Sequence, residues 1–241
     1  MCSWTSVRTY RGITMLWLLL FGLVIAVLFG PNLWVSFVLK KYNRHPEPNF
    51  PGTGGELARH LLDKFDLKDV DVVVTEQGDH YNPTDRQVAL TEDKFNGRTL
   101  AAIVIAAHEC GHAIQHARRE PFFLLRYRLA QSAQSAQIVG SALLAASPFI
   151  GGLTVMPHLG LLSFAGAFLV LGYGVAVQLV TLPVELDASF NKALPILSTG
   201  YVSNAQLKPS RTILRAAALT YVAGALVQLL NFWRWLVVLR R

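Results

Sequence analysis

Long uncharged runs dominate the hydrophobic pattern of this chain. Residues 12–39 and 216–233 carry no charged side chain, and residues 129–184 carry none apart from His158. A membrane-spanning helix needs about 20 predominantly apolar residues, and the middle run is long enough for two, with a proline and a glycine to turn the chain at Met156–Gly160. The pattern therefore predicts four transmembrane helices, at about residues 13–33, 136–156, 160–181 and 214–236.

Two other interpretations of these runs fit the sequence less well. Four such helices could be buried in a soluble core, but a chain of 241 residues is too short to wrap them in protein. The first run could be a cleaved signal peptide, since Arg8 and Arg11 precede it. However, it is longer than the usual apolar signal region, and no small-x-small cleavage site follows, so we expect an uncleaved anchor.

The polar segment after the first run has the pattern of a small α+β module. Thr53 and Glu56 have the spacing of a helix capping box, and the leucines that follow recur at helical intervals. Thr99 can cap a second, longer helix. The predicted elements are a helix after Thr53, a strand at Val70–Thr75, turns at Gln77–Asp85, a strand at Gln87–Thr91, and a helix at about residues 100–117 that Pro121 ends.

The stretch His108-Glu109-Cys110-Gly111-His112 lies on the longer helix and matches the pattern HExxH. Residues four apart share one face of a helix, so both imidazoles can bind one zinc ion. Glu109 points to the same cleft, where it can take a proton from zinc-bound water. The pattern predicts one catalytic Zn²⁺ per chain, with His108 and His112 as ligands and Glu109 as the general base. The alternative is a chance arrangement on a polar helix face.

Catalytic zinc usually has three protein ligands, so a third must come from elsewhere in the chain. His116 continues the row of histidines but lies one turn, about 6 Å, further along the helix, so we expect it at the surface or in support of a ligand. After residue 120 the only acidic side chains are those of Glu185 and Asp187. Two predicted spans separate them from the motif, so the chain returns to the same side and either carboxylate could be the ligand.

At this point the sequence resembles the YugP-type neutral zinc metallopeptidases of bacterial membranes. The resemblance rests on the run DHYNPTDRQVALTEDKFNGRTLAAIVIAAHECGHAIQH and the later LPVELDAS and ALTYVAGAL, and it extends from about Tyr42 through the last span. It implies a membrane-embedded zinc-dependent endopeptidase, for which we expect membrane or misfolded proteins as substrates.

A more distant likeness is to the HtpX and Ste24 type of gluzincin membrane proteases, which carry HExxH and a later ExxAD. This likeness implies Glu185 as the third zinc ligand. Ser189 stands where those proteases have an aspartate. Because that aspartate helps to orient a ligand histidine, we expect Asp187 or Asn191 to substitute for it.

Substrate binding and the stabilisation of the oxyanion need further groups. The strand at Gln87–Thr91 is expected to pair with an extended peptide. A catalytically idle membrane adaptor and a small transporter are the alternative functions, but the presence of Glu109 disfavours the first, and the near absence of ionisable residues from the spans disfavours the second. The candidate oxyanion donors are His80, Tyr81, Tyr201 and Arg211.

The expected fold class is a mainly α, integral membrane protein whose four transmembrane helices carry a small α+β, zincin-like (gluzincin) module with the HExxH helix. The expected parts are the N-terminal tail 1–12, the first transmembrane helix and its boundary 13–39, the catalytic module 40–128, the second and third transmembrane helices 129–182, the third-ligand segment 183–212, and the fourth transmembrane helix with the C-terminal tail 213–241.

The net charge of +7 does not require a nucleic-acid partner, because the basic residues cluster beside the apolar runs. More Lys and Arg side chains flank the spans on the motif face than on the opposite face. We therefore expect a multi-pass protein of the bacterial cytoplasmic membrane, with its catalytic site on the cytoplasmic face and both termini outside. The expected partners are the lipid bilayer and protein or peptide substrates, whereas the oligomeric state does not follow from the sequence.

Overall fold

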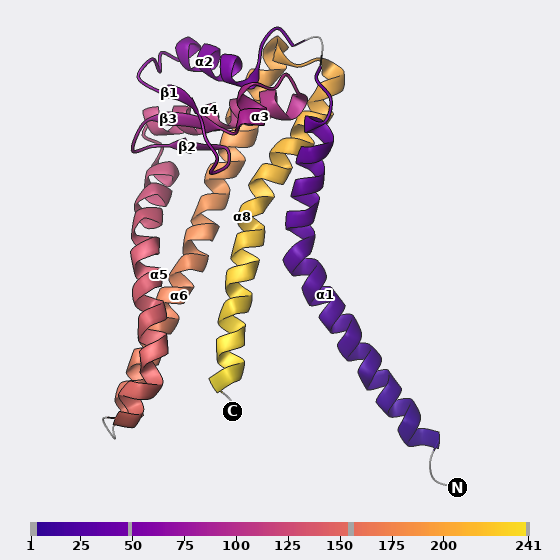
Figure 1. The fold of residues 1–241 in the computed structure, drawn as a ribbon, viewed down its shortest axis with the longest axis vertical. Helices are drawn as coiled ribbons and strands as arrows, with labels where there is room; N and C mark the ends of the chain where they lie inside the picture. Colours follow the sequence, from indigo (N-terminus) through magenta and orange to yellow (C-terminus); the bar gives the residue numbers. More distant parts are fainter. Residues whose placement is uncertain (1–3, 48–49, 154–156, 240–241) are drawn as a thin grey trace.

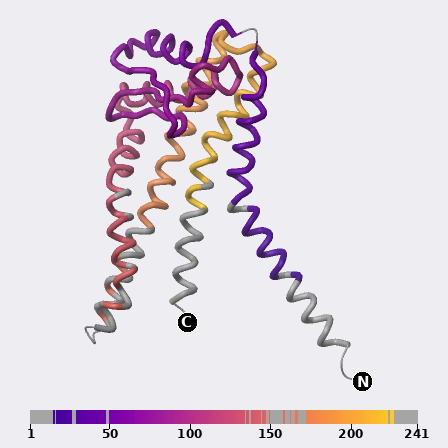
Figure 2. The backbone as a smooth tube through the Cα atoms, viewed as in Figure 1, coloured from indigo at the N-terminus to yellow at the C-terminus, as the bar shows by residue number. Residues whose placement is uncertain are grey.

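The computed structural model describes residues 4–47, 50–153 and 157–239, which are mainly helical with one three-stranded sheet. A small head contains the sheet and the helices α2 (Gly54–Lys64), α3 (Glu92–Phe95) and α4 (Leu100–Ala117). Four long helices leave the same side of this head (Figures 1 and 2). They are α1 (Trp4–Asn43), α5 (Pro121–Leu153), α6 (Pro157–Leu186) and α8 (Asn204–Leu239).

Helix α1 has the character of a membrane span. Within the described residues, one helix segment, Trp17–Asn43, is long and apolar enough to cross a membrane. Large apolar side chains on it, such as those of Phe21 (67% exposed) and Leu33 (68% exposed), are not covered by the protein. The other three predicted spans lie on α5, α6 and α8, and the four-span arrangement stays a prediction. Residues 154–156 of the turn region lie outside the described residues, and α6 begins at Pro157.

The sheet has the strand order β1-β3-β2. Strand β3 (Gln87–Leu90) lies in the middle, parallel to β1 (Asp71–Val74) and antiparallel to β2 (His80–Asn82). The prediction that Gln87–Thr91 pairs with a substrate is therefore wrong, because both edges of β3 already have partners. The outer strands are β1 and β2. Strand β2 lies inside the segment predicted only as turns, where its three residues are too few to give a strand pattern.

Helix α4 is the centre of the head, and its bounds agree with the prediction. Every residue from Leu100 to Gln115 is buried, including the polar side chains of the zinc motif. The helices α2 and α3, strands β2 and β3, and the α8 end nearest the head pack against it. Helix α2 begins with the predicted capping box, in which the Thr53 hydroxyl accepts from Glu56 N and the Glu56 carboxylate accepts from Thr53 N.

The segment between α6 and α8 is more helical than its prolines and glycine predict. Helix α6 continues into a wide π-helical stretch, η1 (Asp187–Ala193), followed by α7 (Leu194–Ile196) and a second π-helical stretch, η2 (Leu197–Tyr201). The break falls at Gly200, whose φ of 119° suits glycine. Stretches of π-helix occur frequently at functional sites, and η1 packs directly on α4.

The N-cap of α4 offers a test of this packing. The Thr99 hydroxyl accepts a hydrogen bond from Ala102 N and donates one to Asn43 Oδ1, at the end of α1. Replacing Thr99 with Ala should lower the free energy of unfolding by about 1–2 kcal/mol, because both bonds are lost. Thr99→Ser keeps the hydroxyl and should stay close to wild type. Thermal unfolding in detergent measures both, and an equal loss in the two variants would assign the effect to the methyl group instead.

Candidate metal centre

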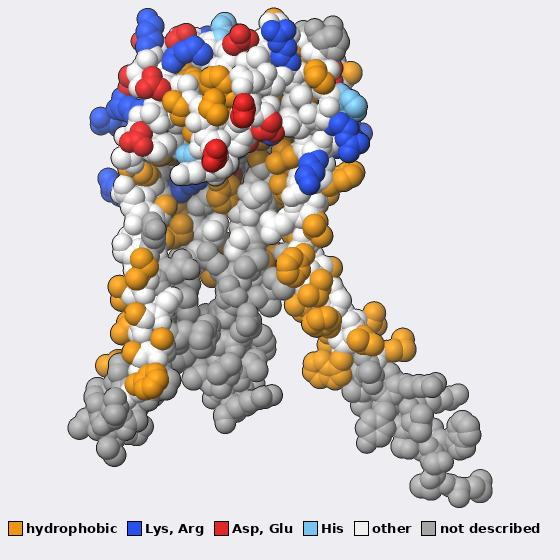
Figure 3. All heavy atoms as spheres, in the orientation of Figure 1, with side chains coloured by type: hydrophobic (Ala, Val, Ile, Leu, Met, Phe, Trp, Pro, Cys, Tyr) orange, Lys and Arg blue, Asp and Glu red, His pale blue; other side chains and the backbone are white. Residues whose placement is uncertain are grey.

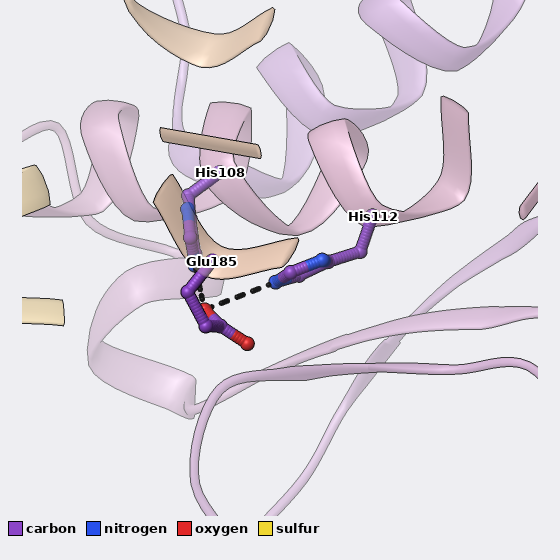
Figure 4. Close-up of side chains that lie close together, drawn as sticks. All are labelled: His108, His112 and Glu185. Carbon is purple, nitrogen blue, oxygen red and sulfur yellow. Dashed lines mark hydrogen bonds and ion pairs between the residues drawn. The ribbon is translucent and has the colours of Figure 1, made fainter. Parts of the chain in front are cut away.

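Three buried side chains converge at one point beside α4 (Figure 4). His108 and His112 come from successive turns of α4, and Glu185 comes from the last turn of α6. Glu185 Oε2 lies 3.2 Å from His108 Nε2 and 3.3 Å from His112 Nε2. All three atoms lie within 4.8 Å of one another.

The separation of the Glu185 carboxylate from the two imidazoles suits zinc. In a tetrahedral zinc site, bonds of about 2.0–2.1 Å hold neighbouring ligand atoms about 3.3 Å apart. The distances from Glu185 Oε2 to the two imidazoles match this separation. Two imidazoles and one carboxylate also form a ligand set that catalytic zinc sites use, with a fourth position left open for reactants. The residues present therefore fit the metal.

Gly111 explains how the third side chain comes so close. A Cβ atom at this position would lie 2.9 Å from the carbonyl oxygen of Ala188 in η1. Only glycine lets the two backbones approach to this distance without a shift. The approach brings the end of α6 across the face of α4 that carries the two histidines.

Gln115 fixes the orientation of His112. Its side-chain nitrogen donates to the carbonyl oxygen of Val184 (2.9 Å) and to the carboxylate of Asp187 (2.7 Å). Its side-chain oxygen, 2.9 Å from His112 Nδ1, must therefore act as an acceptor. As a result His112 carries a proton on Nδ1, so Nε2, beside Glu185, is the nitrogen that can bind the metal.

Ser189 makes the corresponding contact with the other histidine. Its buried hydroxyl lies 3.2 Å from His108 Nδ1. Asp187 and Asn191, the expected substitutes for the aspartate, are not the partners of His108. The Asp187 carboxylate instead accepts hydrogen bonds from Gln115 and Asn191 and pairs with Lys192. Serine thus occupies the place of the aspartate that the distant relatives carry, while Asp187 acts on His112 through Gln115.

The second oxygen of Glu185 faces a cation. Arg126 Nη1 lies 2.8 Å from Glu185 Oε1, in an ion pair without the alignment of a hydrogen bond. Burial would by itself raise the pKa of Glu185, but His112 and His108 outweigh burial and hold the pKa well below its ordinary value. The third candidate ligand is therefore an ionised carboxylate, as metal coordination requires.

Glu109 lies in the same cleft, which has a volume of about 320 Å³. Burial raises the pKa of Glu109 to about 7, against an opposing effect of His108. The neighbouring Cys110 points away from the cleft, and its thiol donates to the carbonyl oxygen of Ala58 at 3.6 Å. His108 thus faces the metal position, and Glu109 supplies a carboxyl group in the same cleft.

The other predicted residues divide into two groups. His80 and Tyr81, at strand β2, line the cleft. Tyr201 instead contacts His60 in a separate cavity, and Arg211 is an exposed residue of α8, so neither lines the cleft. His116 is outside the metal cluster: its Nδ1 lies 2.8 Å from the Tyr81 hydroxyl, and burial together with Arg86 lowers its pKa.

Four residues of the site were not predicted from the sequence. Gln115 and Ser189 each lie four residues or fewer from a predicted site residue on a helix, so helical spacing could have suggested them. Arg126 and Tyr221 give no such signal, because α5 and α8 bring them to the cleft from distant positions. Tyr221 stacks on the Arg126 guanidinium, 5.5 Å from the ring centroid.

The fold and the site define a mainly helical protein with a zinc-type site of two histidines and a glutamate and, among the residues that the structure describes, one candidate membrane span. The chain belongs to the family described as "putative neutral zinc metallopeptidase", whose model matches residues 16–240. It is 37% identical over 222 residues to the "Putative membrane protease YugP" of Bacillus subtilis (strain 168), and the match covers 90% of this chain and 94% of that protein. The predicted resemblance is confirmed, and zinc is the cofactor of this family. No solved structure matches the chain.

The contact between Gln115 and His112 can be tested through the metal. Gln115→Leu removes the acceptor at His112 Nδ1 and should weaken zinc affinity about 10–100-fold, the usual effect of losing an outer partner of a ligand. Competition with a zinc-chelating dye measures this affinity without an activity assay. Gln131→Leu, at an exposed glutamine of α5, is the matched control and should leave the affinity unchanged. Wild-type affinity in Gln115→Leu would contradict the assigned role.

Proposed function

We propose that this protein is a zinc-dependent endopeptidase of the gluzincin type, in which His108, His112 and Glu185 hold the metal. The observation that carries the proposal is the convergence of these side chains with the Glu109 carboxyl in one cleft. When bound, zinc would polarise a peptide carbonyl and lower the pKa of water. The family and the protease name of the relative support a peptide or protein substrate.

Glu109 is the proposed proton carrier. Its carboxylate takes a proton from a water molecule in the cleft and passes it to the nitrogen of the leaving amine. Its place directly after His108 on α4 keeps it beside the metal position throughout the reaction. The buried surroundings exclude bulk water, so the proton has few other acceptors.

Strand β2 is the proposed guide for the substrate. It is one of the two edge strands of the sheet, and His80 and Tyr81 at this strand line the cleft. An extended peptide that pairs with β2 would pass below α4 with its backbone fixed. His80 and Tyr81 are also the proposed donors to the oxyanion. Tyr201 and Arg211 lie outside the cleft and are not proposed for this role.

We also propose that the protein spans the cytoplasmic membrane four times, with the head and the site on the cytoplasmic side. The uncharged runs on α1, α5, α6 and α8, the exposed apolar side chains of α1 and the membrane protease name of the relative support this arrangement. Figure 3 shows charged side chains on the head and apolar ones along α1 and α5 below it. Membrane or misfolded proteins are the proposed substrates, and residues 40–128 with 183–212 form the proposed gluzincin module.

Zinc content tests the ligand assignment. The detergent-purified wild type should contain about one zinc per chain, whereas Glu185→Ala should bind zinc more than about tenfold more weakly, because it loses a ligand rather than an outer partner. His116→Ala is the matched control and should retain the metal. Elemental mass spectrometry measures the zinc content of all three proteins. If His116→Ala loses zinc and Glu185→Ala retains it, His116 rather than Glu185 is a ligand, and the site lies one turn further along α4.

Activity tests the role of Glu109. Glu109→Gln should retain zinc but lose about 10²–10⁴-fold in kcat, because the amide cannot carry the proton. The assay follows cleavage of an unfolded, fluorescently labelled protein, with chelation and re-addition of zinc as controls. Undiminished cleavage by Glu109→Gln would reject its role. A wild type that holds zinc and cleaves no substrate would favour the idle adaptor.

A further inference from the structure

The long helices are arranged as an open arc. Helix α5 packs along α6, α6 packs against α8, and α8 packs against α1. In the described part of the chain, α1 and α5 form no comparable pair, so the arc is open between them. Below the head, Figure 3 shows the described parts of α5 on the left and of α1 on the right, well apart from each other.

The catalytic cleft lies at the head end of this opening. Its lower walls are Val35 and Leu39 of α1 on one side and Tyr127 and Ala130 of α5 on the other. Helix α8 closes the back with residues that include Ala217. Helix α4 forms the roof with the candidate metal ligands, and β2 lies beside it. The long helices thus contribute apolar side chains to the cleft, but α5 and α8 also contribute the polar side chains of Arg126, Tyr127 and Tyr221.

The cleft lies at the same distance from the predicted span of α1 as from that of α5. Leu39 lies six residues beyond the predicted end of the first span, at about residue 33, and Ala130 lies six residues before the predicted start of the second, at about residue 136. Six helical residues cover about 9 Å, which an extended chain covers in about three residues. A peptide bond in the cleft would therefore lie about three residues from the membrane boundary.

The volume of the cleft limits the conformation of the peptide that it can bind. A volume of about 320 Å³ suits a short extended segment. A helix about 10 Å in diameter does not fit beside the metal ligands. A helix can therefore occupy the opening between α1 and α5, but its chain must become extended before it reaches Glu109 and Glu185.

We propose that the opening between α1 and α5 binds a transmembrane helix of the substrate, and that cleavage occurs about three residues beyond the cytoplasmic end of that helix. The inference rests on the proposed endopeptidase function and membrane orientation, and it narrows the substrate class to membrane proteins cut next to a span. The apolar side chains of Val35, Leu39 and Ala130 match the helix, and the outer edge of β2 matches the extended segment that follows.

Trapping tests the binding site without catalysis. Asn32 and Ala133 lie one turn below Val35 and Ala130 on the same helix faces, on either side of the opening. In a Glu109→Gln, Cys2→Ser background, Asn32→Cys or Ala133→Cys is mixed in vesicles with a substrate whose transmembrane helix carries one cysteine. Both positions should form at least about fivefold more disulfide adduct than Leu179→Cys, at an exposed site on α6. Equal adducts at all three positions would overturn the proposal.

Cleavage position tests the distance. One cleavable sequence is placed 0, 3, 6 or 12 residues after the same transmembrane helix, and the identical soluble peptide serves as the reference for protease activity itself. Cleavage should peak at three residues and fall at least about tenfold at twelve, because an extended chain of twelve residues carries the bond about 40 Å away. Equal rates across the series and for the soluble peptide would overturn the entry route while leaving the endopeptidase function in place.

Discussion

The Glu185 carboxylate is 1% exposed, and burying an unpaired carboxylate costs several kcal/mol. The structure meets this cost with charge and hydrogen-bond partners from two other elements: the imidazoles of α4 lie beside one oxygen and the guanidinium of α5 beside the other. The same contacts therefore connect α4, α5 and α6. Because a partner cannot be removed without leaving a buried charge, the integrity of the head and that of the candidate metal site depend on the same group.

The wider site shows how a helix buried on all sides can still carry polar chemistry. Three polar side chains in the buried part of α4 have defined partners: Ser189 for His108, Gln115 for His112, and Val184 and Asp187 for Gln115. These partners come mainly from the end of α6 and from η1. The close backbone contact at Gly111 makes their approach possible, so the third candidate ligand and the groups that orient the first two arrive together.

Local patterns were the part of the structure that the sequence could predict. The bounds of α4, the capping box of α2 and the strand at residues 70–75 follow from capping and periodicity, which depend on neighbouring residues. The convergence of Glu185 on the two histidines needed a family resemblance, because 73 residues separate it from His112. The order of the sheet, the contact of Ser189 and the arrival of Arg126 depend on packing between distant segments. No local spacing encodes them, and the predictions that involved them were wrong or missing.

The Cys110 thiol lies inside the zinc motif, and its surroundings determine its redox behaviour. It is fully buried, donates to a backbone carbonyl of α2, and has a pKa raised by burial. The thiolate, which is the form that attacks disulfides and reacts with peroxide, is therefore scarce at neutral pH. Cys110 also points away from the metal position, so it does not compete with the histidines for zinc. A centre built in this way tolerates oxidising conditions, and alkylating reagents that inactivate thiol proteases would leave it intact.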